Sequence, residues 1–225
     1  HRRLYRIKIR QVKPDFRLIA IPKQIKVANG NQILQYSPAL RRGGTMMLGL
    51  QLQRRDGFNG RVEVKVEGLP KGVTCPAVTF DTTSSSVPLV FSAAENAAIW
   101  SGKIRIVATA MINGKKESRE ARAMTVVWST ANKTQNLPEF RAMQDIVLAV
   151  GEDKDPIFAQ ASTGTLIQTA RGAQVKIPLN VTRRNGYAGN LKFVATGLPK
   201  QLKPGDITLK GKATKGTISL NVTNK

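Results

Sequence analysis

One stretch of the chain occurs twice, and this repeat decides the fold. Residues 42–71 read RGGTMMLGLQLQRRDGFNGRVEVKVEGLPK, and residues 171–200 read RGAQVKIPLNVTRRNGYAGNLKFVATGLPK. The stretches align without a gap at an offset of 129 residues, and 11 of their 30 positions are identical. Solenoid repeats have periods of about 20–50 residues. The much longer period found here predicts two like domains in tandem.

Apolar and polar residues alternate on both sides of the repeated glycine loop at 54–60. The alternating apolar residues of the first copy are Leu48, Leu50, Leu52, Val62, Val64 and Val66. A period of two is typical of strands with one buried face. We therefore expect these six side chains to face the core of the first domain. Two strands that flank a short glycine loop also predict a β-hairpin.

Similar short strands recur along the chain, separated by Gly and Pro turns. They are expected at residues 5–10, 16–21, 78–80, 87–91, 103–110 and 121–128. Asn113-Gly114 is a strong signal for a tight turn between the last two. Many short strands at regular spacing predict an all-β chain of two tandem Ig-like β-sandwich domains.

The repeat offset also divides the chain. We expect residues 1–13 to hold the last strand of a preceding domain, and residues 14–128 to form the first sandwich. Residues 129–138 read as a polar linker, and residues 139–225 as the second sandwich. The second sandwich lacks a counterpart of residues 97–128, which predicts that it is truncated or is completed by another chain segment.

The chain is strongly basic. It carries 36 Lys and Arg against 14 Asp and Glu, a formal net charge of +22. Residues 1–128 have 22 basic and 8 acidic residues, and residues 129–225 have 14 and 6, so both domains contribute. A field of this sign attracts polyanions. Candidate partners are acidic proteins, acidic polysaccharides and, non-specifically, nucleic acid.

The residues that most enzymes need are scarce. The chain has one Cys, Cys75, and one His, His1. A catalytic thiol needs a nearby base, and zinc sites need several His or Cys ligands. We therefore expect a protein without catalytic activity, bound metal or cofactor. No run of 18 apolar residues occurs, so no membrane insertion is expected.

Five segments carry a distinctive pattern of strand and turn residues: Tyr5–Ile9, Lys13–Phe16, Arg41–Gly44, Arg54–Gly60 and Glu67–Val73. The pattern resembles the Ig-like repeats of large secreted proteins from planctomycete-type bacteria. In those proteins a bacterial pre-peptidase C-terminal (PPC) β-sandwich often precedes the repeats, and its last strand is similar to residues 5–10. The resemblance implies an extracellular or cell-envelope module without catalytic activity. It covers most of the first domain and the middle of the second.

The repeated loops place two arginines side by side in each domain: Arg54, Arg55, Arg183 and Arg184. A guanidinium group binds phosphate, sulfate or carboxylate through two hydrogen bonds, so the pairs are candidate polyanion contacts. Alternatively, one arginine of each pair lies over Phe58 or Tyr187, and the other meets a carboxylate or solvent. Asp56 is replaced by Asn185 in the second copy, which indicates a turn residue rather than a catalytic acid.

Two further clusters are candidate sites. The first strand carries a basic edge, formed by Arg2, Arg3, Arg6, Lys8 and Arg10. It could contact a polyanion, or it could keep an edge strand from aggregating. The second cluster, Glu152, Asp153 and Asp155, offers the oxygen ligands that Ca²⁺ takes. Its spacing matches no calcium loop, and a solvated acidic turn is the alternative.

Three function classes follow from these observations. The first is a structural and interaction module, a tandem Ig-like spacer whose partners include other domains of the same polypeptide. The second is a polyanion-binding module, which a steep dependence of binding on salt would identify. The third is an accessory domain of a larger enzyme.

Overall fold

The protein is all-β, as the alternation of apolar residues predicted. The computed structural model describes residues 11–22, 25–26, 32–33, 38–128, 139–161, 167–193, 198 and 201–223. These residues form strands, turns and loops, and none of them is helical. The predicted strand at 5–10 and the predicted linker at 129–138 lie outside the described residues.

Two six-stranded sheets make the first sandwich. One sheet has the order β13-β12-β1-β5-β9-β7. Its strands are β13 (Glu139–Met143), β12 (Arg122–Trp128), β1 (Asp15–Pro22), β5 (Thr45–Arg55), β9 (Ser86–Ala93) and β7 (Val73–Thr74). The other has the path β4-β14-β10-β6-β8, with β11 also paired to β10. Its strands are β4 (Ala39–Arg42), β14 (Ile146–Lys154), β10 (Trp100–Ile112), β6 (Val62–Glu67), β8 (Val78–Phe80) and β11 (Lys115–Glu120).

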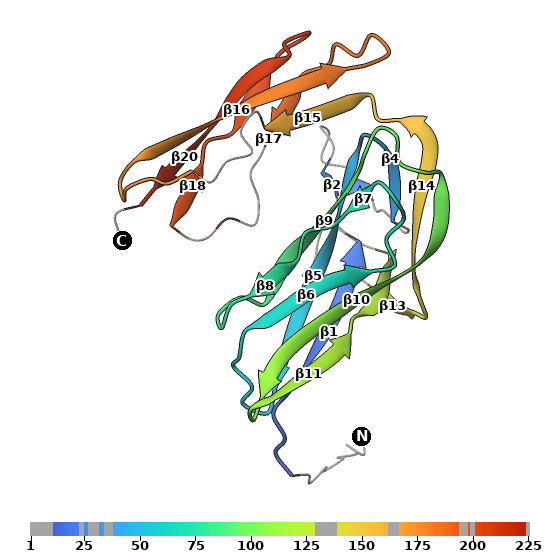
Figure 1. The fold of residues 1–225 in the computed structure, drawn as a ribbon, viewed down its shortest axis with the longest axis vertical. Helices are drawn as coiled ribbons and strands as arrows, with labels where there is room; N and C mark the ends of the chain where they lie inside the picture. Colours follow the sequence, from blue (N-terminus) through green and yellow to red (C-terminus); the bar gives the residue numbers. More distant parts are fainter. Residues whose placement is uncertain are drawn as a thin grey trace, which may run out of the picture.

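The strand order identifies the first sandwich as Ig-like. In an immunoglobulin domain, strands A, B, E and D share one sheet, while C, F and G share the other. Here β1, β5, β9 and β7 lie in the order A-B-E-D, and β6, β10 and β11 lie in the order C-F-G. Figure 1 shows these strands in blue to green, running along one elongated body.

The predicted hairpin between the strands that flank residues 54–60 is wrong. β5 pairs with β1 and β9, whereas β6 pairs with β10 and β8. The glycine loop therefore crosses from one sheet to the other. Alternation reveals which face of each strand is buried, and two strands on opposite sheets bury their faces in the same core.

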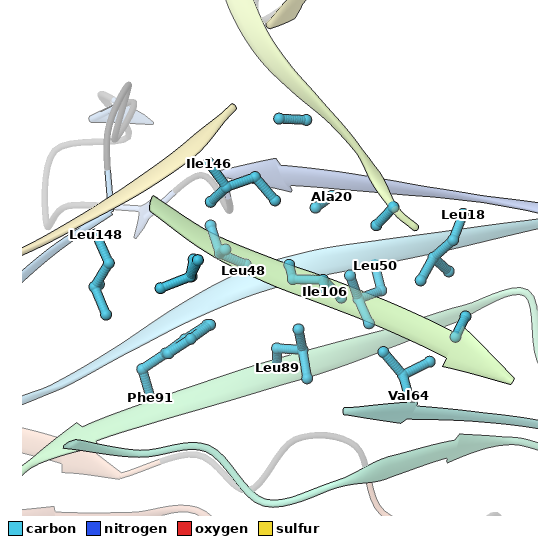
Figure 2. Close-up of a cluster of buried hydrophobic side chains, with 14 of the residues drawn as sticks. Leu18, Ala20, Leu48, Leu50, Val64, Leu89, Phe91, Ile106, Ile146 and Leu148 are labelled. Carbon is cyan, nitrogen blue, oxygen red and sulfur yellow. The ribbon is translucent and has the colours of Figure 1, made fainter. Parts of the chain in front are cut away.

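The core of the first sandwich contains the predicted side chains. Leu50 and Val64 are fully buried, and Leu48, Leu52 and Val62 are also buried. Val66 is partly buried and packs against them. Figure 2 shows Leu50 and Val64 with Leu89, Phe91 and Ile106, which all project into the space between the sheets.

The Asn-Gly turn is confirmed. Asn113 and Gly114 have φ values of 49° and 76°, and they join β10 to β11 as an antiparallel pair. Two consecutive positive φ values are the mark of the tight hairpin turn that this dipeptide favours. After β11, the chain changes sheets and continues as β12, which pairs in parallel with β1.

The second sandwich repeats part of this plan. One sheet has the order β15-β16-β20-β18, and a second sheet pairs β17 with β19. The strands are β15 (Ile157–Ala161), β16 (Gln174–Arg183), β20 (Lys215–Val222), β18 (Leu202–Pro204), β17 (Leu191–Phe193) and β19 (Ile207–Leu209). β16 corresponds to β5 and β17 to β6 at the repeat offset. Among the described residues after 156, no strand takes the places of β10 to β12.

The two cores differ in size. Among the described residues, 27 buried apolar side chains form the first core. In the second, Leu179, Val181 and Leu209 are buried together, with partly buried residues around them. A small separate hairpin of β2 (Ile25–Lys26) and β3 (Gln32–Ile33) completes the described strands.

The boundary between the sandwiches lies further along the chain than the predicted linker at 129–138. β13 pairs with β12, and β14 pairs with β10 and β4, so residues 139–154 belong to the first sandwich rather than the second. Ile146, Leu148 and Val150 of β14 are buried in the first core. The change occurs at Asp155 and Pro156, since β15 already pairs with β16. In Figure 1, β14 leads directly from the first sandwich to β15.

Candidate functional site

The first arginine of each repeated loop closes that loop from within. Nη1 of Arg54 donates a hydrogen bond to the carbonyl oxygen of Gly60, and Nη2 donates one of 2.6 Å to that of Asp81. The guanidinium carbon lies 5.6 Å from the centroid of the Phe58 ring. Phe58 is buried and packs at 5.5 Å against Phe16 of β1. Arg54 therefore connects the loop to the core.

Arg183 does the same in the second sandwich. Its Nη1 donates a 2.7 Å hydrogen bond to the carbonyl oxygen of Gly189, and its Nε donates one of 3.0 Å to that of Ala213. Its guanidinium carbon lies 5.8 Å from the Tyr187 ring. The prediction that one arginine of each pair lies over the aromatic residue is confirmed.

The same geometry explains why Gly60 and Gly189 recur in the two loops. A Cβ atom at Gly60 would lie 2.8 Å from the ring of Phe58, and one at Gly189 would lie 2.6 Å from Oη of Tyr187. Both approaches are closer than van der Waals contact allows. The motif Arg-Arg-x-Gly-Phe/Tyr-x-Gly is therefore a packing unit in which the aromatic ring folds back over a glycine.

Asp56 and Asn185 occupy equivalent turn positions. Their φ values are 52° and 53°, in the left-handed region. Asp and Asn tolerate this region better than other residues with side chains. The carboxylate of Asp56 also accepts a 3.3 Å hydrogen bond from the backbone N–H of Lys13. The prediction of a turn residue, rather than a catalytic acid, agrees with this conformation.

The second arginine has different surroundings in the two sandwiches. Arg184 lies where the sandwiches meet, and its side chain is only 16% exposed. It forms an ion pair with Glu95, in the loop between β9 and β10. It also donates a 2.7 Å hydrogen bond to the carbonyl oxygen of Asp155, and its guanidinium carbon lies 6.0 Å from the Phe158 ring.

Arg55 has no such environment. It ends β5 opposite Asp15 of β1 and is half-buried. Its side chain makes no ion pair or hydrogen bond within the described part of the chain. Of the four loop arginines, three are thus held by contacts inside the protein. The structure does not bring the four together into one surface.

Three further hydrogen bonds, each with a backbone group as donor or acceptor, reinforce the junction around Arg184. Nε of Arg42 donates a 2.8 Å hydrogen bond to the carbonyl oxygen of Glu152, and the N–H of Asp155 donates one of 2.9 Å to that of Arg42. The carboxylate of Asp155 accepts a 3.0 Å hydrogen bond from the N–H of Ile157. The partners Glu95 and Asp155 were missed from the sequence, because they are 89 and 29 residues away from Arg184.

The carboxylates proposed as a calcium site do not converge. Glu152 and Asp153 are exposed neighbours on β14, and adjacent strand residues project to opposite faces. Asp155 lies at the junction instead. Within the described residues, no three or more His, Cys, Asp or Glu side chains form a group able to hold a metal ion.

Cys75 has the character of an inert thiol. It is half-buried, and burial raises its pKa from 9.0 to about 11. A thiol with a raised pKa is almost wholly protonated at neutral pH, and only the thiolate is a nucleophile. The predicted basic edge at Arg2, Arg3, Arg6, Lys8 and Arg10 lies outside the described residues, as does His1, and stays a prediction.

Comparisons with known proteins add no identification. The chain matches no described protein family, and no curated protein matches it. One solved structure with similarity is a protein of unknown function from Porphyromonas gingivalis W83, at 14% identity and a TM-score of 0.34, over 92% of this chain and 83% of that one. Another is a marsupial T cell receptor, at 8% identity and a TM-score of 0.26, over 96% and 88%. Because both scores are low, the Ig-like assignment rests on strand order.

One further observation concerns membranes. Among the described residues, no helix has the length and apolar character needed to span a bilayer.

Proposed function

We propose that the chain is a structural and interaction module without catalytic activity, a tandem Ig-like spacer of a large extracellular or envelope protein. The observation that supports this most is the junction. Arg184 is largely buried between the sandwiches, and only Asp155 and Pro156 separate β14 from β15. A short, hydrogen-bonded connection holds two bodies at a set angle, which is what a spacer requires.

The contacts made by the recurring residues support the same proposal. Arg54, Arg183 and the aromatic residues beneath them stabilise loops. No pair of described side chains in these loops combines a nucleophile with a base. A purified chain that hydrolysed a peptide, ester or glycoside, and lost this activity through one point substitution, would contradict the proposal.

The test of the spacer is the angle between the sandwiches. Residual dipolar couplings of backbone amides, measured separately for β5 and β16, report whether the two bodies share one alignment tensor. We expect one tensor for the native chain and two for Arg184→Ser. Arg55→Ser is the matched control, since it occupies the same place in the other repeat and should leave a single tensor. Two tensors in the native chain would refute a fixed spacer.

The net charge of +22 supports a second candidate, binding of polyanions through the general basic surface. The loop arginines are poor candidates for a dedicated site, because three of them already have partners. Non-specific binding to heparin or duplex DNA should be strong at low salt and vanish near physiological ionic strength of about 0.15 M. Binding that persists there would indicate a dedicated site.

A further inference from the structure

The first sandwich has a groove beside the first half of β1, where β12 does not yet pair with it. The two strands pair in parallel at only two positions, Ile19 with Arg122 and Ala20 with Ala123. From Asp15 to Leu18, β1 keeps its partner β5 on one edge but has no paired strand on the other among the described residues. A groove with a volume of about 450 Å³ lies along this open edge.

The groove is lined by two kinds of side chain. Ile19 and Met124 supply apolar surface, and Arg17, Arg122 and Gln53 supply polar groups. Ile19 and Met124 are half-buried, whereas Arg17 and Arg122 are exposed. A surface with an apolar base and a few placed polar groups is typical of a recognition site.

Two cations of the groove have no partner among the described residues. Arg17 and Arg122 make no ion pair or hydrogen bond within that part of the chain. Both carboxylates of the groove are already engaged, Asp15 by Arg119 and Glu120 by Arg105. An anion that enters the groove therefore meets available guanidinium groups, while the acidic groups that would repel it are neutralised by their partners.

The register sets the spacing of these cations. Arg122 is opposite Ile19, and Arg17 is two residues before Ile19 on the same face of the sheet. With an interstrand spacing of about 4.8 Å and a rise of about 3.3 Å per residue, the two Cα atoms are about 8 Å apart. Side chains as long as arginine can reach across this distance to one segment. Gln53 lies opposite Arg17 on β5.

The contacts of Asp15 show how a carboxylate is held at this end of β1. One oxygen of its carboxylate accepts a 2.8 Å hydrogen bond from the backbone N–H of Phe16 and a 3.1 Å bond from Nε of Arg119. The N–H of Phe16 thus bonds to a side chain at one end of the open stretch. Because Asp15 already engages this N–H and Arg119, an acidic ligand would use the rest of the edge together with Arg17 and Arg122.

We propose that this groove binds an extended acidic peptide segment of a partner protein. The backbone of the segment adds to the open edge of β1, as in β-strand addition. Its outward carboxylates lie between Arg17 and Arg122, whose planar groups bind carboxylate through two hydrogen bonds. An extended peptide is favoured over a polysaccharide because the open edge offers backbone donors and acceptors.

The test uses a fluorescent peptide of sequence VEVEVEV and the full chain at about 0.15 M salt, where non-specific attraction is screened. The paired variant Arg17→Ser with Arg122→Ser should weaken binding by about ten-fold or more, since each lost charge-assisted bond weakens the complex. The matched control is Lys176→Ser with Lys203→Ser, which removes the same charge from exposed sites on the second sandwich and should change affinity by less than about two-fold.

Three other outcomes would overturn the proposal. Equal losses in the two paired variants would show that only total charge matters. Equal binding of the same peptide with every backbone amide N-methylated would exclude addition to the edge, because that peptide has no N–H to donate. Tighter binding of a heparin hexasaccharide, with the same dependence on Arg17 and Arg122, would assign the groove to acidic sugars. Each of these results leaves the spacer proposal standing, because that proposal depends on the junction at Arg184.

Discussion

Arg184 of the second sandwich forms an ion pair with Glu95 of the first. The two residues come from a loop after β16 and a loop after β9. They meet beside Gly43, where a Cβ atom would lie 3.5 Å from Nη1 of Arg184. At the repeat offset, Arg184 corresponds to Arg55, and Glu95 corresponds to Asn224. The second repeat therefore has an uncharged residue at the position where the first repeat has the acidic partner of this ion pair.

A double-mutant cycle measures this pair. We expect Glu95→Ala and Arg184→Ala to show a coupling free energy of about 1 kcal/mol or less, because the Glu95 side chain is half exposed. Arg184→Ala alone should cost more than Glu95→Ala, since it also removes the hydrogen bond to the Asp155 carbonyl. Urea unfolding of the four chains gives these values. Strict additivity would show that the pair contributes nothing.

Arg54 and Arg183 should matter far more for stability than Arg55. Replacing either by alanine leaves loop carbonyls without their donor and should cost about 1–3 kcal/mol. Arg55→Ala should lie within about 0.5 kcal/mol of the native value, as for most partly exposed positions without a partner. Lysine should not rescue Arg54, because one ammonium group cannot serve both Gly60 and Asp81 while lying over Phe58. Full rescue by lysine would contradict this account.

Two glycines with similar backbone angles should respond differently to alanine. Gly57 and Gly72 have φ values of 79° and 84°, so each substitution carries a conformational cost of about 1–2 kcal/mol. A Cβ at Gly57 would meet nothing within 4 Å, whereas one at Gly72 would lie 2.8 Å from the Cα of Ala97. Gly72→Ala should therefore destabilise by clearly more than Gly57→Ala in thermal unfolding. Equal effects would mean that the loop around Ala97 moves freely.

Cys75 gives the protein a pH dependence at high pH. Burial raises the thiol pKa from 9.0 to about 11 in the folded chain. A raised folded pKa stabilises the fold fully below pH 9, and this stabilisation is lost as the pH rises from 9 through about 11. Cys75→Ala should flatten the unfolding free energy in this window. Alkylation of the native chain by iodoacetamide should likewise remain slow until the pH approaches 11. Rapid alkylation at neutral pH would contradict the burial of the thiol.

The second sandwich should exchange its amide hydrogens faster than the first. β5 and β16 are aligned in sequence, but β5 borders a core of 27 buried side chains, whereas only three cluster beside β16 among the described residues. Local opening costs less free energy where little apolar surface is buried. Hydrogen exchange followed by mass spectrometry should show lower protection in residues 174–183 than in residues 45–55. Equal protection would require a second core as stable as the first.

The sequence was a good guide to which side chains are buried. Leu50 and Val64 could be placed in the core because strand alternation depends only on neighbouring residues. The stacking of Arg54 on Phe58 was also among the sequence-based alternatives, since the two are four residues apart. Local patterns of this kind can be predicted from the sequence because they do not depend on which distant segments pack together.

Features that depend on how distant segments of the chain come together could not be predicted from the sequence. β5 and β6 are adjacent in sequence but lie in different sheets, and no local signal distinguishes such a crossing from a hairpin. The alternation in Ile146, Leu148 and Val150 shows a strand, but not that it completes the sandwich before it. The groove beside β1 arises because β12 begins at Arg122 and pairs with β1 only from Ile19 onward, a consequence of tertiary geometry.

The position of β14 affects how the chain would carry tension. β14 belongs to the first sandwich by its hydrogen bonds, yet it continues into β15 after two residues. A pull on the second sandwich therefore acts along β14. Its bonds to the antiparallel β10 run across the strand and would be loaded together in shear rather than opened one at a time. Mechanical load on the second sandwich is thereby passed to a core strand of the first.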